Sequence, residues 1–194
     1  MPFERHYIRP TSQGHLDRVR NTVVQKALDL GCTHLWLCDS DQKYPQNTLI
    51  KLIEHNLDVV GAKVHRRWPP YEPVMYRYDI CYPHYNDVPD EEWINSRGLI
   101  EVDSVGTGCL LVKADVFKNV KYPWFKFDEI DGRPIGEDVY FAHKVRELGY
   151  KIFVDTSINV GHVTTMIINT EFYMAYKQVA AKQNGNKIIH RTND

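Results

Sequence analysis

Hydrophobic positions along the first third of the chain switch between helical and strand spacing. Residues 15–30 carry an apolar stripe at three- and four-residue intervals, which predicts a helix, and the next glycine is a suitable end for it. A continuous apolar run over residues 34–38 predicts a strand covered on both faces. A helix over about 47–55 and a strand over 57–64 follow. This alternation indicates parallel α/β units joined by right-handed crossovers. The members of the stripe are Leu16, Val19, Val23, Ala27 and Leu30.

The second part of the chain begins with a different pattern. Residues 65–98 are rich in proline, tyrosine and acidic residues, which predicts mostly long loops, with one strand near 74–78. Regular spacing returns in the remaining segments. These are strands over 99–105, 109–112 and 151–154, a helix over 137–148, a loop over 155–165, and a terminal helix over 170–183 with a polar tail.

Length and composition place the chain among globular proteins. We expect one domain over residues 1–194, with 65–98 rich in loops and 166–194 as a C-terminal helix and tail. The formal net charge of −1 gives no electrostatic reason to expect nucleic acid as a partner. No apolar run reaches the roughly 18–20 residues that span a bilayer, and the N-terminus lacks a signal-peptide pattern. We therefore expect a cytoplasmic protein without a transmembrane segment.

Two carboxylates follow the predicted strand 34–38 directly. Asp39 and Asp41 stand one residue apart, at the strand end where α/β sheets bind ligands. Two acids this close repel each other unless a cation or hydrogen-bond donors lie between them. Mg²⁺ and Mn²⁺ accept oxygen ligands and also bind phosphates. The alternative is that both are ordinary turn residues at the surface.

Two further sites stand out, each beside a predicted element. Glu137 and Asp138 open the helix 137–148, where acids also simply favour the helix dipole. His162 follows Gly161 in the loop after the last strand, where a surface or core histidine is the plain alternative. Their joint occurrence with Asp39 and Asp41 in one α/β chain favours a functional interpretation.

The ordered set of segments resembles the GT-A fold glycosyltransferases, most closely the family 2 type. The resemblance covers roughly residues 18–165 and implies a Rossmann-like three-layer α/β/α sandwich with a mostly parallel central sheet. Its motifs are Asp39-Ser40-Asp41, Val59-Val60-Gly61-Ala62, Val105 to Leu111, Gly136-Glu137-Asp138 and Gly161-His162.

The resemblance implies a metal site and a catalytic base. Asp41 would bind a divalent metal directly, with Asp39 as a less direct ligand and His162 as a third contact, and the imidazole favours Mn²⁺ over Mg²⁺. The metal would neutralise the diphosphate of a UDP- or GDP-sugar. If transfer to the hydroxyl acceptor inverts the anomeric carbon, Asp138 would be the general base, and a retaining transfer is the alternative. Glu137 would orient the acceptor or the helix start.

Donor binding is implied for a second set of residues. Asp39 would contact the ribose, and the turn ending at Gly108 would let a sugar approach the backbone closely. Arg20 and Asn21 would contact the nucleotide, with a solvated helix face as the alternative. Arg66 and Arg67 are candidate phosphate ligands, although a solvated basic pair is an equal alternative.

The chain departs from the family pattern before the first acidic motif. Only 38 residues precede Asp39, too few for the usual unit that grips the nucleobase. We expect that a short segment with Arg9, Thr11 and Gln13 replaces it, that another subunit completes the pocket, or that the base is held loosely. The sheet edge left open would need cover, and a homodimer is one way to supply it.

Two other functions compete with a metal-dependent glycosyltransferase. One is a non-catalytic nucleotide- or carbohydrate-binding module. The other is a nucleotidyltransferase, which lacks support because no Gly-rich, basic phosphate loop opens the chain. The expected acceptor is a carbohydrate or a lipid-linked one, and the aromatic terminal helix with Tyr173 and Tyr176 is a candidate contact for lipid.

Overall fold

The computed structural model describes residues 4–10, 14–79, 84–166 and 169–189, and the chain forms two compact units. The first unit, residues 1–163, contains all the sheets described below. The second, residues 164–194, contains the helix α6 (Thr170–Ile189). The predicted terminal helix is therefore present, and it extends beyond residue 183.

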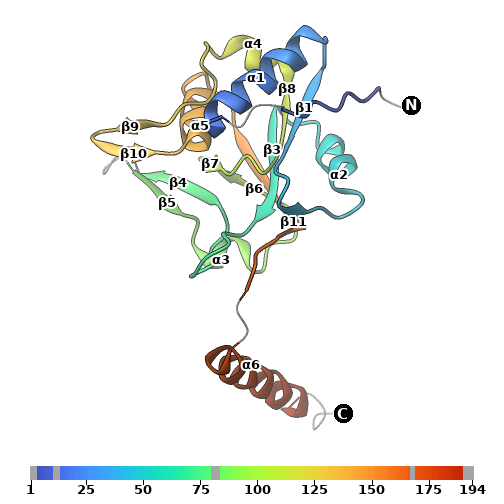
Figure 1. The fold of residues 1–194 in the computed structure, drawn as a ribbon, viewed down its shortest axis with the longest axis vertical. Helices are drawn as coiled ribbons and strands as arrows, with labels where there is room; N and C mark the ends of the chain where they lie inside the picture. The colour runs from blue at the N-terminus through green and yellow to red at the C-terminus, as the bar shows by residue number, and fades with distance from the viewer. Residues whose placement is uncertain (1–3, 11–13, 80–83, 167–168, 190–194) are drawn as a thin grey trace. The chain divides into compact units, whose positions relative to one another are not determined.

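A six-stranded sheet forms the centre of the first unit (Figure 1). Its order is β1-β8-β3-β11-β2, and β6 pairs with β11 beside this path. Its strands are β1 (His34–Cys38), β2 (Gln42–Lys43), β3 (Val59–Val64), β6 (Leu99–Val102), β8 (Cys109–Lys113) and β11 (Ile152–His162).

The strand directions correct the prediction of a mostly parallel sheet, because four of the five strand pairs of this sheet are antiparallel. β1, β3 and β11 share one direction, since β1 and β3 both pair antiparallel with β8, and β3 pairs parallel with β11. β8, β6 and β2 run the opposite way. The β3–β11 pair is thus the one directly parallel pair among the described strands. The sequence pattern indicates only the order of the elements along the chain. The position of β8 between β1 and β3 depends on long-range packing.

Helices cover both faces of the sheet, which confirms the expected α/β class with three layers (Figure 1). Side chains of α1, α4 and α5 pack with Leu35 and Leu37 of β1 in one buried cluster. Leu52 of α2 packs with Val60 and Ala62 of β3 in the other. The helices are α1 (Leu16–Asp29), α2 (Thr48–Glu54), α4 (Ala114–Asn119) and α5 (Glu137–Glu147).

Residues 65–98 contain more regular structure than the proline-rich pattern predicted. β4 (Met75–Asp79) and β5 (His84–Asp87) pair antiparallel, and β7 (Ser104–Val105) joins β4 to complete a three-stranded sheet. α3 (Asp90–Trp93) follows. Pro73 and Pro89 lie outside these elements, so they do not interrupt the strand ladder.

A second short hairpin precedes α5, in a segment for which the sequence pattern predicted no strand. It joins β9 (Asp128–Ile130) to β10 (Arg133–Ile135), with Gly132 at φ 75° in the turn. A third difference concerns the end of the central sheet. β11 continues through the predicted loop 155–165 as far as His162, with a register shift between Asp155 and Asn159.

The helix α1 is present as predicted, but a different face of it is buried. Leu16 and Leu30 are 42% and 46% exposed, whereas Arg20 and Asn21 are buried beside Val24. Apolar spacing does not predict this orientation of the helix. Arg20 is buried through ion pairs and Asn21 through hydrogen bonds, as described below.

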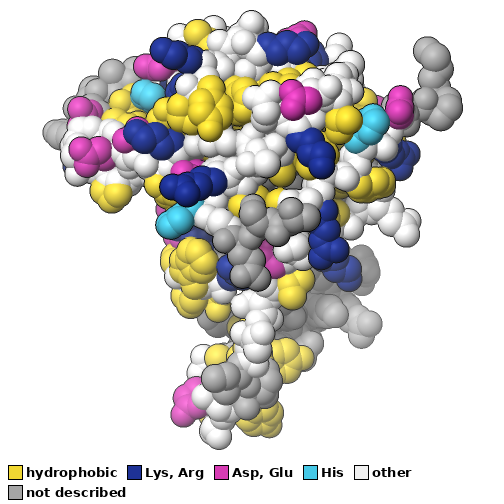
Figure 2. Space-filling view, turned by 45° about the horizontal axis from the view of Figure 1, so that its top comes forward, with side chains coloured by type: hydrophobic (Ala, Val, Ile, Leu, Met, Phe, Trp, Pro, Cys, Tyr) yellow, Lys and Arg dark blue, Asp and Glu magenta, His cyan; other side chains and the backbone are white. Residues whose placement is uncertain are grey.

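The surface carries charges of both signs. On the face drawn in Figure 2, acidic and basic side chains are interspersed among hydrophobic ones, which agrees with the net charge of −1. Within the described ranges, no helix combines the length and the apolar character needed to cross a bilayer.

Candidate active site

The end of β1 positions Asp39. Its backbone amide donates to the carbonyl of Gly108 at 3.0 Å, which extends the β1–β8 ladder by one residue. The Tyr44 hydroxyl lies 2.8 Å from the carbonyl oxygens of both Asp39 and Gly108. The turn after β1 is thereby tied to the turn before β8, so the Asp39 carboxylate points from a fixed backbone.

The pairing of β2 with β11 brings Asp41 and His162 together. Gln42 and Lys43 pair with His162 and Gly161, and the amide of Val163 donates to the Asp41 carbonyl at 2.8 Å. The His162 Nε2 atom lies 3.4 Å from Asp41 Oδ2. Two of the three predicted metal ligands therefore meet, although they stand 121 positions apart in the sequence.

The His162 ring has a defined orientation. Its Nδ1 atom lies 2.7 Å from the carbonyl oxygen of His65, which only accepts hydrogen bonds, so Nδ1 carries the proton. When the ring is neutral, Nε2 then has a free lone pair facing the Asp41 carboxylate. The Arg67 guanidinium also reaches this carboxylate, with Nη1 2.9 Å from Oδ2.

Arg20 of α1 joins the two acidic motifs. Its guanidinium forms an ion pair with the Glu137 carboxylate, and its Nη2 lies 3.3 Å from Asp39 Oδ1. The side chains of Arg20 and Glu137 are 9% and 8% exposed, so this pair is buried. Arg20 thereby fixes the end of β1 against the start of α5.

Asp138 follows Glu137 at the start of α5 and is partly buried. Its Oδ1 accepts a hydrogen bond from the Val139 amide at 2.8 Å. Burial raises the pKa of the Asp138 carboxyl, while the Val139 amide and the Arg20 charge oppose that rise. A carboxyl with a raised pKa is a better proton acceptor, as a general base requires.

These elements enclose a cavity of about 190 Å³, which we call the donor pocket. It contains four of the predicted site residues in its lining besides Glu137 and Asp138. The complete lining is Leu16, Arg20, Asp39, Gln42, Val64, Val74, Gly106, Thr107, Gly108, Glu137, Asp138 and His162.

Gly108 is required by close approach at the floor of this pocket. A Cβ atom there would lie 2.0 Å from Gln42 Nε2 and 2.9 Å from Asp39 Oδ2. Gln42 and Thr107 were not predicted as site residues. Each has a buried side-chain oxygen without a hydrogen-bond partner among the described residues. Gln42 follows the Asp39-Ser40-Asp41 motif, and Thr107 lies within the Val105 to Leu111 motif. Such buried oxygens are suited to bind a ligand.

Two other predicted donor contacts, Asn21 and Arg9, are not among the described residues that line the donor pocket. The Asn21 amide group bonds the backbone of the loop before β9, with Nδ2 2.7 Å from the Phe125 carbonyl and Oδ1 3.0 Å from the Trp124 amide. Arg9 is exposed and is not among the lining residues described. Thr11 and Gln13 lie outside the described residues.

The residues predicted to bind the metal fit a divalent ion only in part. Among the described residues, no three histidine, cysteine or acidic side chains are grouped to hold a metal. Asp41 Oδ2 and His162 Nε2 nevertheless face each other, which is unfavourable for two lone pairs unless a cation or a proton lies between them. A metal-binding histidine usually donates its other nitrogen to a carbonyl, as His162 does. The pair thus fits two protein ligands of an ion completed by phosphate and water.

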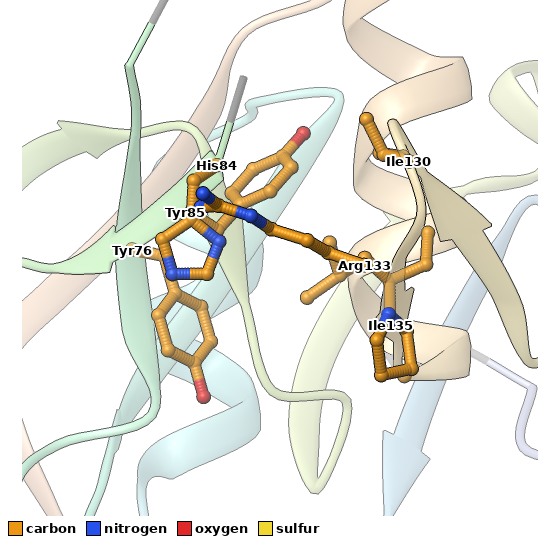
Figure 3. Close-up of a pocket in the computed structure, with 9 residues that line it drawn as sticks. Tyr76, His84, Tyr85, Ile130, Arg133 and Ile135 are labelled. Carbon is orange, nitrogen blue, oxygen red and sulfur yellow. The ribbon is translucent and has the colours of Figure 1, made fainter. Parts of the chain in front are cut away.

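A second cavity, of about 180 Å³, lies beside the start of α5 (Figure 3). We call it the hairpin pocket because β4–β5 and β9–β10 form its walls. Figure 3 shows Arg133 extending from β10 toward His84 and Tyr85 on the opposite wall. Its lining is Tyr76, His84, Tyr85, Ile130, Arg133, Pro134, Ile135, Gly136 and Val139.

Comparison with known proteins supports the fold. No protein-family model and no curated protein sequence matches the chain. The solved structure of A197 from STIV superposes with a TM-score of 0.56 and 18% identity, over 79% of this chain and 70% of A197. GalNAc-T7, solved with UDP, GalNAc and Mn²⁺, superposes with a TM-score of 0.53 and 14% identity, over 82% of this chain. This chain spans 32% of the GalNAc-T7 chain. The α/β fold is thus of the GT-A type.

Proposed function

We propose that the chain is a metal-dependent glycosyltransferase that moves a sugar from a UDP- or GDP-sugar to a hydroxyl acceptor. The observation that carries this proposal is the donor pocket. It brings Asp39, His162 and Asp138 together from the ends of β1 and β11 and the start of α5. The GT-A type of fold and the nucleotide and Mn²⁺ bound by GalNAc-T7 support the same function.

Asp41 and His162 would hold the ion, Mn²⁺ or Mg²⁺, with Asp39 contacting the donor or the ion indirectly. When bound, the ion supplies Lewis-acid neutralisation of the diphosphate leaving group. Arg67 already contacts Asp41, so its guanidinium is close enough to turn to a phosphate. Gly108 would let the donor approach the backbone, and the Thr107 and Gln42 oxygens would accept hydrogen bonds from its hydroxyl groups.

Asp138 would take the proton of the acceptor hydroxyl, and direct attack would invert the anomeric carbon. The burial that raises the Asp138 pKa matches this role. Glu137 is a positioning residue, since its carboxylate is held by Arg20. Arg20 keeps Asp39 and the start of α5 in register, so the two halves of the site stay aligned.

A non-catalytic binding module is the second candidate, and the Arg67–Asp41 ion pair favours it. A guanidinium on Asp41 satisfies that carboxylate without a metal. In this case the donor pocket would bind a nucleotide or sugar without turnover.

Nucleotide release from UDP- and GDP-sugars, with Mn²⁺, Mg²⁺ or a chelator, separates the two functions. We expect metal-dependent release from one donor and its loss in Asp41→Asn. Asp58→Asn is the matched control, because Asp58 is an exposed acid paired with Lys113. Nucleotide binding without release under every condition would favour the binding module. Release that is equal in wild type and Asp41→Asn would contradict the metal assignment.

A further inference from the structure

The hairpin pocket adjoins the donor pocket at the residue that precedes the proposed base. Gly136 lines the hairpin pocket, and Glu137 and Asp138, which follow it, line the donor pocket. The Asp138 charge also contributes to the raised pKa of Tyr76, after the larger effect of burial. A molecule in the hairpin pocket would therefore lie beside the carboxyl group that accepts a proton.

The charge of the hairpin pocket is positive. Arg133 and His84 are its ionisable residues apart from two tyrosines, and no carboxylate is among its nine described lining residues. Within the described part of the chain, Arg133 has neither an ion-pair nor a hydrogen-bond partner. Other arginines nearby are paired. Arg66, for example, lies 2.7 Å from Asp87 and 3.0 Å from Glu72. An unpaired guanidinium across a pocket is suited to bind an anion.

The aromatic wall of the pocket suits the apolar face of a sugar. The Tyr76 hydroxyl is 3.4 Å from Arg66 Nη2, and the Tyr85 hydroxyl is 3.3 Å from His143 Nδ1. Because these hydroxyls contact other residues, the two rings contribute mainly apolar surface. Ile135 and Val139 add aliphatic surface around them. Aromatic rings with polar groups at the margin are common where proteins bind amphipathic ligands.

We infer that the hairpin pocket binds the acceptor, and that this acceptor is an anionic saccharide whose carboxylate or phosphate pairs with Arg133 while its ring packs on Tyr76 and Tyr85. The inference rests on the proposed transferase function, to which it adds the acceptor class. It needs neither the donor nor the metal for binding, so it is testable apart from turnover.

Binding is measured by isothermal titration calorimetry on the full chain, without nucleotide or metal. The probes are methyl β-D-glucuronide, glucose 6-phosphate, neutral methyl β-D-glucoside and inorganic phosphate. We expect one or both anionic saccharides to bind about 10-fold or more tightly than the glucoside, as a charge-assisted hydrogen bond provides. The stronger of the two names the anion as carboxylate or phosphate.

Variants then locate the binding. Arg133→Ala is expected to weaken the anionic saccharide about 10- to 100-fold and to remove the preference over the glucoside. Arg133→Lys should retain part of the affinity. Arg97→Ala is the matched control, since Arg97 is exposed and lies outside the described lining of both pockets. Amide NMR shifts should map to β4, β5 and β10.

Four results would overturn the inference. They are equal affinity for neutral and anionic saccharides, unchanged binding in Arg133→Ala, inorganic phosphate binding as tightly as glucose 6-phosphate, and no binding by any probe. Metal-dependent nucleotide release that persists in any of these cases leaves the transferase function standing. Saccharide binding at Arg133 without such release refutes the transferase and with it the acceptor role, and leaves only a binding site for an anionic saccharide.

Discussion

The donor pocket and the hairpin pocket are similar in volume, but they differ in whether the arginine in their lining is paired. Their volumes are about 190 and 180 Å³, and they meet at the start of α5. In the donor pocket, Arg20 is buried and shared between Glu137 and Asp39. In the hairpin pocket, Arg133 extends from an exposed position and has no partner among the described residues.

This difference separates an arginine that holds the site together from one that is available to a ligand. A buried cation must be paired within the protein, because its desolvation is otherwise too costly. Arg20 therefore acts as an internal crosslink. An exposed cation keeps its hydration until a ligand arrives, so Arg133 contributes little to folding. Substitution of Arg20 should therefore change stability, whereas substitution of Arg133 should change ligand binding.

The largest expected effect is on catalysis. Asp138→Asn removes the proposed base, so we expect sugar transfer to fall about 10²- to 10⁴-fold, while nucleotide binding is retained. Product formation at saturating donor measures this change. Asp115→Asn, an exposed acid of α4 paired with Lys118, is the control that should retain full activity. A transfer rate within a few-fold of wild type would exclude Asp138 as the base.

The same variant should be more stable than wild type, although it is less active. Burial raises the Asp138 pKa in the folded chain above its unfolded value. The stability contributed by the neutral carboxyl is therefore present below the unfolded pKa and is lost as pH rises through the folded pKa. Asp138→Asn should be more stable than wild type near pH 7, and this advantage should disappear at acidic pH. Thermal unfolding across pH measures it, and an advantage that is independent of pH would contradict the raised pKa.

Replacing the two arginines compares the pockets directly. Arg20→Met leaves Glu137 buried without its partner, so we expect the free energy of unfolding to fall by about 3–5 kcal/mol. Arg133→Met should change it by less than about 0.5 kcal/mol. Denaturant unfolding measures both. The double variant Arg20→Met/Glu137→Leu should recover much of the loss, and failure to recover it would mean that Asp39 depends on Arg20 more than Glu137 does.

The residue between the pockets should produce a smaller effect. A Cβ atom on Gly136 would lie 2.7 Å from Asp138 Oδ1, so Gly136→Ala should displace the carboxylate. We expect the rate of sugar transfer to fall by up to about 10²-fold, because small misplacements of reacting groups have large effects on rate. The loss of stability should be small. Gly98→Ala is the control, because a Cβ atom there meets nothing within 4 Å. Steady-state transfer rates compare the two, and equal rates would mean that Asp138 has room to move.

The smallest expected effect concerns a hydroxyl in the hairpin pocket. Tyr76→Phe removes a long hydrogen bond, whereas Arg66 keeps its two carboxylate partners. We expect the affinity for the anionic saccharide to change less than about 2-fold. Tyr76→Ala removes the ring and should weaken binding about 3- to 10-fold. Calorimetry on both variants tests whether the ring or the hydroxyl matters, and a large loss in Tyr76→Phe would assign the hydroxyl to the ligand.

Local pattern was sufficient to predict most of the elements. The strand over 34–38 and the helix beginning at Glu137 have the predicted starts. The first has a continuous apolar run and the second a helical apolar spacing, and each has a clear boundary. Asp39, Gly108, Asp138 and His162 all line the donor pocket, and their roles there stay predictions. The hydrophobic pattern failed to predict burial where side chains are buried through ion pairs and hydrogen bonds. The buried face of α1 contains Arg20 and Asn21, which spacing alone assigns to solvent.

By itself, the sequence determined the α/β class and the acidic motifs at element ends, since hydrophobic period and local turn chemistry depend on nearby residues. Tertiary structure alone decided that β8 lies between β1 and β3, that β2 brings Asp41 to His162, and that Arg20 joins Asp39 to Glu137. It also decided that two hairpins enclose a second pocket with Arg133 across it. These contacts join segments far apart in the chain, and their free energy depends on burial and charge pairing that exist only in the folded molecule.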